Sequence, residues 1–397
     1  MDDNKRQNDI AEERQPKKRL SYDDAVKNFE DAEVKQPKVR RNGWLGNLIL
    51  TAIIVIGILL MFKMTRELIG EDVKPFDEVI AGIDLPYLLA FFAVLLAVFA
   101  LASFKYSLLI RTLDGKWRFG LSVKVMFIGK YYDNVTPLTT GGQPMQIYYL
   151  HKHGFSGGKA GAVVFARFFL HVMIWLTVAA VLMLSNSAVL STLDEASAQF
   201  LRAFGWIGWG VTAFMPIFVI VFTLLPRFAY KLTVVVVKLG AKLKIVKNKE
   251  KTIRKAIKTV RDFRASFVIL KKSPLKLVLL VLACVVEVCA VFALPYFILL
   301  AFGDTSLPSG FSSFYDVMTL TAFSTFSVVF IPTPGNSGFV EGASTLAFRN
   351  VAASLLPWMV VTWRFAICYV YVLIGIVFTV VDMVKNSVKR KKENNEH

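Results

Sequence analysis

The sequence contains few residues of the types that bind metals or form disulfides. It has three cysteines and four histidines in 397 residues. Cys284, Cys289 and Cys368 all lie inside apolar stretches, where a cysteine is read as a small core residue rather than as part of a disulfide framework. His151 and His153 are close together, but no histidine spacing suits a zinc site. The sequence therefore predicts no metal and no cofactor.

Signature motifs of soluble enzymes are also missing. There is no GxGxxG and no P-loop in the chain. A cleavable signal is not visible either, because residues 1–43 are polar and densely charged. We therefore expect the first apolar stretch to be an uncleaved anchor, and the sequence favours no soluble catalytic domain.

Apolar residues, in contrast, are abundant. They make up 55% of the chain, and the mean hydropathy is positive. They lie in stretches of about 20 residues, the length that a helix needs to cross a bilayer. The sequence predicts an all-α polytopic membrane protein with about six full spans, at 44–62, 85–104, 160–184, 204–225, 277–301 and 355–381.

The net charge of +18 is concentrated in one segment. Residues 227–276 hold sixteen Lys/Arg and two acidic residues, and they lie between two predicted spans. A basic loop of this kind indicates the cytoplasmic side and attracts anionic lipid headgroups, so we expect no nucleic-acid partner. Lys105 and Arg111 are interpreted in the same way, as residues that mark the cytoplasmic end of the span at 85–104.

This charge pattern gives a consistent topology with both termini in the cytoplasm. Residues 1–43 are expected to form a charged, mobile tail. Residues 44–384 form the membrane domain, which includes the basic cytoplasmic segment 227–276, and 385–397 form a basic cytoplasmic tail. The sequence leaves the oligomeric state open.

Two further apolar stretches, 119–150 and 312–351, are interrupted by proline, glycine and polar residues. A straight spanning helix does not tolerate such clusters. The topology places the entrance of the first stretch on the cytoplasmic side and that of the second outside, which predicts two oppositely oriented re-entrant hairpins of broken helices. The alternative is two kinked full spans with glycines for helix packing. Changing one hairpin into a full span would, however, move every later loop to the other side of the membrane, against the charge pattern.

Broken helices that meet inside the membrane predict a phosphate site. A helix start presents free N–H groups and a partial positive charge. Pro144 suits the first turn of a helix, and neighbouring glycines let backbone approach a ligand closely. The candidate phosphate-binding residues of the two stretches are Asn134, Thr136, Gly141, Gly142, Gln143, Gly335, Asn336, Ser337 and Gly338.

Charged residues within the apolar stretches complete the candidate site. Arg167 and Arg364 either contact a lipid phosphate or form structural ion pairs, such as Arg364 with Glu341. Glu287 has no obvious partner nearby in the sequence, which favours a functional role. An unpaired charge at the bilayer centre costs at least about 2.5–3.5 kcal/mol, so all should face the protein interior. The candidates for proton coupling are Glu287, Glu341 and Asp133.

At these motifs the sequence resembles the flippase-like membrane family typified by the transmembrane region of lysylphosphatidylglycerol synthase, the multiple peptide resistance factor. The resemblance covers 44–384. It is carried by Arg167, by Arg364 and by the motifs Asn134-Val-Thr-Pro, Gly-Gly-Gln-Pro144 and Pro332-Thr-Pro-Gly-Asn-Ser-Gly-Phe-Val-Glu341. Two departures concern Asn336, where the family has a second glycine, and Gln146, near which the family often has an arginine.

The resemblance implies a bacterial inner-membrane flippase that moves an anionic, aminoacylated or glycosylated phospholipid, or a polyprenyl-phosphate lipid, between leaflets. In the synthase the lipid is lysylphosphatidylglycerol, which gives resistance to cationic peptides and is made by a separate aminoacyl-transfer domain. We expect that domain to be absent here. The loss of the arginine near Gln146 suggests a different headgroup.

Two other functions remain open. One is a membrane enzyme of the phosphatidylglycerol lysyltransferase type, for which Asp133, Glu341 and His151 are the candidate groups. The other is a scaffold for a separate lipid synthase. The expected partners are a membrane lipid substrate, anionic headgroups at 227–276 and such a synthase.

Overall fold

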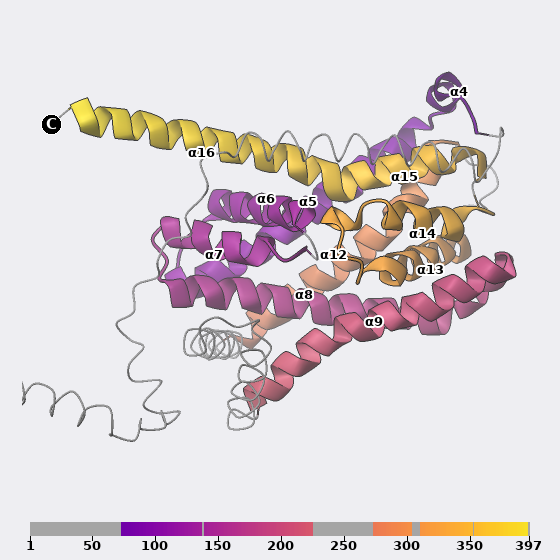
Figure 1. Ribbon diagram of the computed structural model, residues 1–397, viewed down its shortest axis with the longest axis horizontal. Coiled ribbons are helices and arrows are strands. Elements are labelled where there is room, and N and C mark those ends of the chain that lie inside the picture. Colours follow the sequence, from indigo (N-terminus) through magenta and orange to yellow (C-terminus); the bar gives the residue numbers. More distant parts are fainter. Residues whose placement is uncertain (1–72, 137–138, 225–272, 304–309, 352, 396–397) are drawn as a thin grey trace, which may run out of the picture. The chain divides into compact units, whose positions relative to one another are not determined.

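The computed structural model describes residues 73–136, 139–224, 273–303, 310–351 and 353–395. The predicted span at 44–62, the tail at 1–43 and residues 227–272 of the basic segment lie outside these ranges. The described residues form helices and no strand (Figure 1), which confirms the all-helical expectation for this part of the chain.

Four helices in the described part of the chain are long and apolar enough to cross a membrane. They are α5 (Leu85–Asp114), α8 (Gly157–Ser185), α12 (Pro274–Ala301) and the C-terminal span, Leu356–Asp382. At 1.5 Å per residue they measure about 40–45 Å, longer than the ~30 Å hydrocarbon core of a bilayer. They coincide with four of the six predicted spans.

The predicted span at 204–225 coincides with α9 (Glu195–Leu224). The backbone N–H of Ser197 donates to Oδ2 of Asp194 at 3.0 Å, so this carboxylate caps the start of the helix. The same hydrogen bond holds the pKa of Asp194 below its usual range. The short elements before and after the spans are α4 (Phe76–Ala81), η2 (Ser187–Thr192) and η4 (Ala353–Leu355).

The C-terminal span is not a uniform α-helix. It consists of α15 (Leu356–Arg364), a π-helical turn η5 (Phe365–Tyr369) and α16 (Val370–Asn395). A π-turn shifts the rotational register of the helix and is frequent at functional sites. Here it directly follows the buried Arg364. α16 continues through 385–395 of the predicted basic tail.

Both broken stretches fold as two helices separated by an irregular segment. The first is α6 (Phe119–Val135) and α7 (Gly142–Lys152). The second is α13 (Phe311–Val328), the 3₁₀ turn η3 (Pro334–Asn336) and α14 (Phe339–Phe348). The helices of each pair pack against each other. Pro144 lies in the first turn of α7, as the sequence predicts.

The two broken stretches lie between α8 and the C-terminal span (Figure 1). The phenol of Tyr149 on α7 donates to Asp382 near the end of that span, at 2.6 Å. On α14, Glu341 pairs with Arg364 in the first part of the span. The two stretches therefore contact opposite halves of the same helix.

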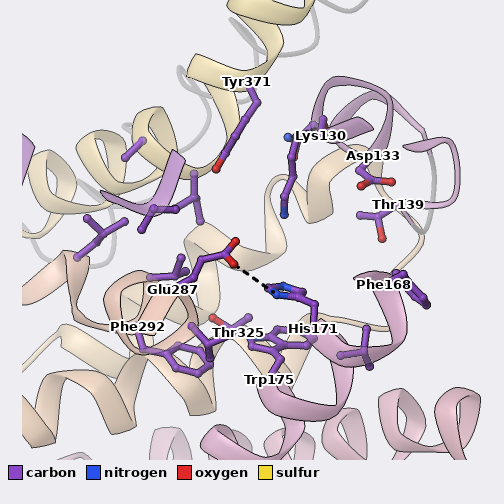
Figure 2. Close-up of a pocket in the computed structure, with 18 of the residues that line it drawn as sticks. Lys130, Asp133, Thr139, Phe168, His171, Trp175, Glu287, Phe292, Thr325 and Tyr371 are labelled. Atoms are coloured by element: carbon purple, nitrogen blue, oxygen red, sulfur yellow. Dashed lines mark hydrogen bonds and ion pairs between the residues drawn. The ribbon is translucent and has the colours of Figure 1, made fainter. Parts of the chain in front are cut away.

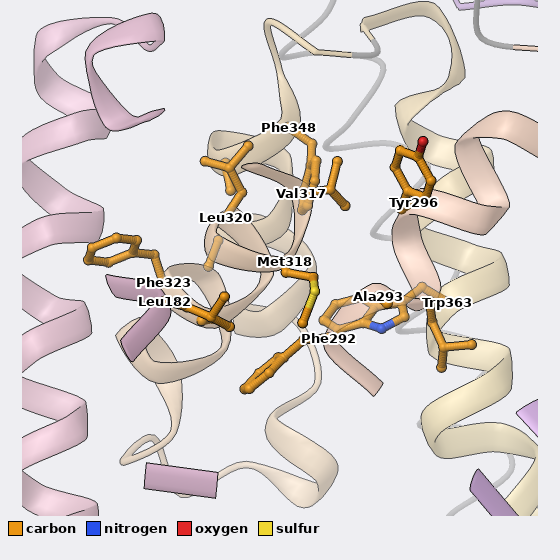
Figure 3. Packing of buried hydrophobic residues seen from close by; sticks show 14 of the residues in the cluster. Leu182, Phe292, Ala293, Tyr296, Val317, Met318, Leu320, Phe323, Phe348 and Trp363 are labelled. Carbon is orange, nitrogen blue, oxygen red and sulfur yellow. The ribbon is translucent and has the colours of Figure 1, made fainter. Parts of the chain in front are cut away.

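The main hydrophobic core joins α8, α12, α13 and α15. Figure 3 shows Leu182, Phe292, Met318, Phe323 and Trp363 packed together in it. Outward faces of the long helices remain apolar, with 60% exposure at Leu89 and 69% at Leu184. Such exposed apolar faces suit contact with lipid.

Candidate functional site

The two broken stretches contact each other where the end of α6 packs against the turn η3. A Cβ atom on Gly335 would lie 3.3 Å from the carbonyl oxygen and the Oδ1 of Asn134. Gly335 and Asn336 both adopt the left-handed conformation, with φ of 57° and 53°. Glycine and asparagine enter this region more readily than other residues. Asn336 thus takes the conformation that a second glycine would take.

The start of α7 is occupied by acceptors from the chain itself. The N–H of Gly142 donates to Oδ1 of Asp133 at 2.9 Å, and the N–H of Gly141 donates to Oγ1 of Thr136 at 2.8 Å. A Cβ on Gly142 would collide with the Asp133 carboxylate. Asp133 therefore fills, with its own negative charge, a helix start at which the sequence predicts a phosphate.

The start of α14 is closed in a similar way. Glu341 accepts from the N–H of Gly338 at 2.7 Å and from Nε of Arg364 at 2.7 Å, with one carboxylate oxygen for each donor. Nη2 of Arg364 also donates to the Gly335 carbonyl and to Oγ of Ser337, both at 3.0 Å. Arg364 thus connects the second break to the C-terminal span. Of the two roles that the sequence leaves open for Arg364, the structure shows the ion pair with Glu341.

A cavity of about 300 Å³ lies beside the meeting point, enclosed by α5, α6, α7, α8, α12, α13 and the C-terminal span (Figure 2). The predicted site residues that line it are Asn134, Gln143, Arg167, Asp133 and Glu287. Those that are not among its lining residues are Thr136, Gly141, Gly142, Gly335, Asn336, Ser337, Gly338, Glu341 and Arg364. The structure therefore divides the predicted set into a cavity group and a group that shapes the two breaks.

Arg167 is the most unusual residue of the cavity. It is 8% exposed, and its buried Nε has no hydrogen-bond partner among the described residues. Its Cζ lies 5.3 Å from the ring centre of Tyr106. Arg167 is ten residues beyond Gly157, the first residue of α8 (167 − 157), hence about 15 Å into the helix. A buried cation that no carboxylate pairs with is unfavourable, so this position favours the binding of an anion.

Glu287 has a partner that the sequence analysis missed. Nζ of Lys105 donates to Oε2 of Glu287, and both side chains are buried. Nδ1 of His171 lies 3.4 Å from Lys105 Nζ and 3.9 Å from Glu287 Oε2, the contact that Figure 2 marks. The assignment of Lys105 to the cytoplasmic end of its span is therefore wrong. The apolar residues 108–110 are the signal in the sequence that α5 continues beyond Lys105.

Lys130 is the second cation that faces the cavity, and it is not among the site residues that the sequence predicts. Its Nζ lies 5.8 Å from the ring centre of Tyr371, and Figure 2 shows its side chain directed toward the centre of the cavity. Within the part of the chain that the structure describes, neither Lys130 nor Arg167 forms an ion pair. The cavity thus presents two cations that no carboxylate neutralises directly.

Thr139 also lines the cavity and has a positive φ of 50°. A β-branched residue rarely adopts this conformation, and such strain is concentrated at functional sites. His151 lies elsewhere, exposed at the end of α7. Among the described residues, no group of three His, Cys, Asp or Glu side chains is placed to hold a metal ion.

Comparison with known proteins identifies the family of the chain. No curated protein and no solved structure matches the chain. A family model described as the lysylphosphatidylglycerol synthase TM region matches residues 48–375. This range includes both broken stretches, all the cavity residues and most of the chain. The protein is therefore a multi-pass membrane protein that belongs to the family of the lysylphosphatidylglycerol synthase transmembrane region.

Proposed function

We propose that this protein is a lipid flippase of a bacterial cell membrane, and that its cavity binds the phosphate of an anionic lipid headgroup. The observation that carries the proposal is the buried Nε of Arg167, which has no partner among the described residues and belongs to a side chain that lines the cavity. Lys130 supplies a second positive charge in the same space.

The position of the cavity supports transport rather than surface binding. Glu287 is thirteen residues beyond the first residue of α12 (287 − 274), or about 20 Å along a helix of 28 residues. Arg167 and Glu287 therefore both lie in the middle part of their spans. A polar headgroup that crosses a bilayer must exchange its water for other polar partners, because unpaired polar groups are costly in hydrocarbon.

The size of the cavity suits a headgroup without its acyl chains. A volume of about 300 Å³ is at the lower end of the range for small-molecule sites. The headgroup would move through the cavity while the acyl chains stay in the bilayer. Asn134 and Gln143 provide neutral hydrogen-bonding groups beside the two cations.

The remaining predicted site residues take a supporting role in this proposal. Asp133 and Glu341 cap the two helix starts, so the phosphate is held by side chains in the cavity and not by these N–H groups. Arg364 holds the second break in place through Glu341, Gly335 and Ser337. Glu287, with Lys105 and His171 next to it, is the candidate for coupling transport to protons.

The proposed topology has two re-entrant hairpins, α6–α7 from the cytoplasmic side and α13–α14 from outside. Their contacts with opposite halves of the C-terminal span support this arrangement. Both termini would then be cytoplasmic, and the basic segment 227–276 would contact anionic headgroups. Resistance to cationic peptides would follow if the lipid that is moved lowers the negative charge of the outer surface.

Lipid translocation in proteoliposomes tests the proposal. Labelled phosphatidylglycerol is incorporated, and its transfer between leaflets is measured for the wild type, Arg167→Ala and Arg202→Ala. Arg202 is an exposed arginine on α9 and serves as the matched control. We expect transfer to be lost in Arg167→Ala and retained in Arg202→Ala. A wild-type rate in Arg167→Ala would remove the cavity from the transport pathway.

A further inference from the structure

The charges around the cavity do not cancel. Its lining includes Lys130, Arg167, Asp133 and Glu287. Glu287 is already neutralised by Lys105, which forms an ion pair with it but does not itself line the cavity. Three cations and two carboxylates therefore give an excess of one positive charge, and protonation of His171 would only increase it.

A ligand with one negative charge would compensate this excess of one positive charge. A phosphodiester carries one negative charge, so a lipid whose headgroup has no other charge would leave the occupied cavity neutral. A lysyl-esterified headgroup carries one phosphate and two ammonium groups, a net charge of +1. It would raise the excess to two positive charges in a buried site, where charges without partners are strongly unfavourable.

Each carboxylate that would receive an ammonium group already has one oxygen in a hydrogen bond. Glu287 accepts from Lys105, and Oδ1 of Asp133 accepts from the N–H of Gly142. Lys130 and Asp133 are three residues apart on α6, so an ammonium group that approached Asp133 would also approach the ammonium of Lys130.

The neutral part of the lining suits an uncharged polyol. Gln143, Gln146 and Thr325 contribute amide and hydroxyl groups, whereas the hydroxyl of Thr321 donates to the Val317 carbonyl. Trp175 and Trp363 supply aromatic faces at the same cavity, and Trp175 is held by stacking on Phe326 with 4.3 Å between ring centres. Amides and hydroxyls next to apolar faces match the alternating O–H and C–H groups of glycerol or a sugar.

We propose that the lipid of this protein carries a phosphodiester joined to an uncharged polyol or sugar, and that the cavity discriminates against a lysylated headgroup. This inference rests on the proposed function, because it concerns the same cavity. Two sources share the chemistry: phosphatidylglycerol, and a polyprenyl phosphodiester that bears a sugar. The lysylated lipid named in the family description would then not be the preferred ligand.

Binding to the full-length protein in detergent tests the proposal. The tryptophan fluorescence of the protein, to which Trp175 and Trp363 at the cavity contribute, is titrated with short-chain phosphatidylglycerol, lysylphosphatidylglycerol and a short prenyl-phosphate sugar. We expect one of the two headgroups without ammonium groups to bind about tenfold or more tightly than the lysylated one, a difference of about 1.4 kcal/mol. The source is whichever of these two lipids binds more tightly.

Two variants make the test specific. Arg167→Ala should lose the preferred ligand, while the exposed Arg202→Ala should bind it as the wild type does. Gln143→Glu adds one negative charge at the cavity with little change in shape, and it should reduce the preference against the lysylated lipid severalfold. A Gln143→Glu protein with unchanged selectivity would contradict the charge argument.

The outcomes separate the inference from the proposed function. If lysylphosphatidylglycerol binds as tightly as the other lipids or more tightly, and needs Arg167, the inference is wrong and the phosphate site stands. If no lipid binds in an Arg167-dependent way, the proposed site and the inference are both wrong.

Discussion

Lys105 and Glu287 form a buried ion pair between two long helices, although they are 182 residues apart in the sequence. Their helices, α5 and α12, pack extensively against each other. Two opposite charges in an apolar contact fix how the helices are rotated and shifted, because any other alignment would leave both without partners. The same pair determines that Glu287 adds no net negative charge to the cavity.

Removing one partner of this pair should destabilise the protein strongly. Glu287→Gln leaves Lys105 charged and buried, and we expect a loss of about 3–5 kcal/mol. Lys105→Met should have a comparable effect. The double variant Lys105→Met/Glu287→Leu lacks both charges. Its loss of stability should therefore be well below the sum of the losses in the two single variants. A thermal-unfolding series in detergent measures this coupling, and additive losses would show that the two groups do not interact.

The two buried arginines should respond oppositely to truncation. Arg364→Ala removes hydrogen bonds to Glu341, Gly335 and Ser337 and leaves Glu341 buried without its cation. We expect a loss of about 3–5 kcal/mol in stability. Arg167→Ala removes a cation whose Nε has no partner, so its stability should be equal to or above that of the wild type while transport is lost. Melting temperature and lipid transfer are measured on the same preparations. A strong destabilisation by Arg167→Ala would indicate a structural role.

Position 336 should accept glycine and reject β-branched residues. Asn336 has a φ of 53°, where residues with a Cβ other than asparagine and aspartate lose about 1–2 kcal/mol. We expect Asn336→Gly to fold as the wild type does and Asn336→Val to be less stable by about that amount. The pair is compared by thermal unfolding. Equal stability of the two variants would mean that the second break is free to change its conformation.

The glycine that begins α7 should not tolerate even one methyl group. In Gly142→Ala the new Cβ collides with the Asp133 carboxylate, so the cap and the α6–α7 packing must shift. We expect lower stability and weaker ligand binding. Gly210→Ala in the exposed middle of α9 is the matched control: its Cβ meets nothing within 4 Å, and alanine favours a helix by up to about 1 kcal/mol. Identical behaviour of the two variants would contradict the close contact between Gly142 and Asp133.

Ligand-dependent stabilisation offers a separate check on the cavity. A lipid that binds only the folded state raises its stability by about 2.7 kcal/mol at one hundred times its dissociation constant. We expect phosphatidylglycerol to raise the melting temperature of the wild type but not that of Arg167→Ala. Glycerol phosphate without acyl chains shows whether the headgroup alone is recognised. A similar increase in both proteins would indicate binding to the outer lipid-facing surface.

The sequence by itself determined the local features of this protein. Apolar stretches of sufficient length predicted the four long helices, and clusters of proline and glycine predicted where α6 and α13 end and where α7 and α14 begin. The pair of Arg364 and Glu341 was also foreseeable as one of two alternatives. The helices and their breaks depend on backbone geometry and hydropathy within a short segment, which neighbouring residues encode directly.

Only the tertiary structure decided how the charged groups are paired. Lys105 was assigned to a helix end because the charge interrupted an apolar stretch, whereas α5 continues to Asp114 and the side chain turns inward to Glu287. Asp133 was a candidate for proton coupling, and it proves to cap α7. Which carboxylate neutralises which cation, and which cation is left for a ligand, depends on the rotation and offset of packed helices. That arrangement is set by contacts between segments far apart in the chain, so no local pattern specifies it.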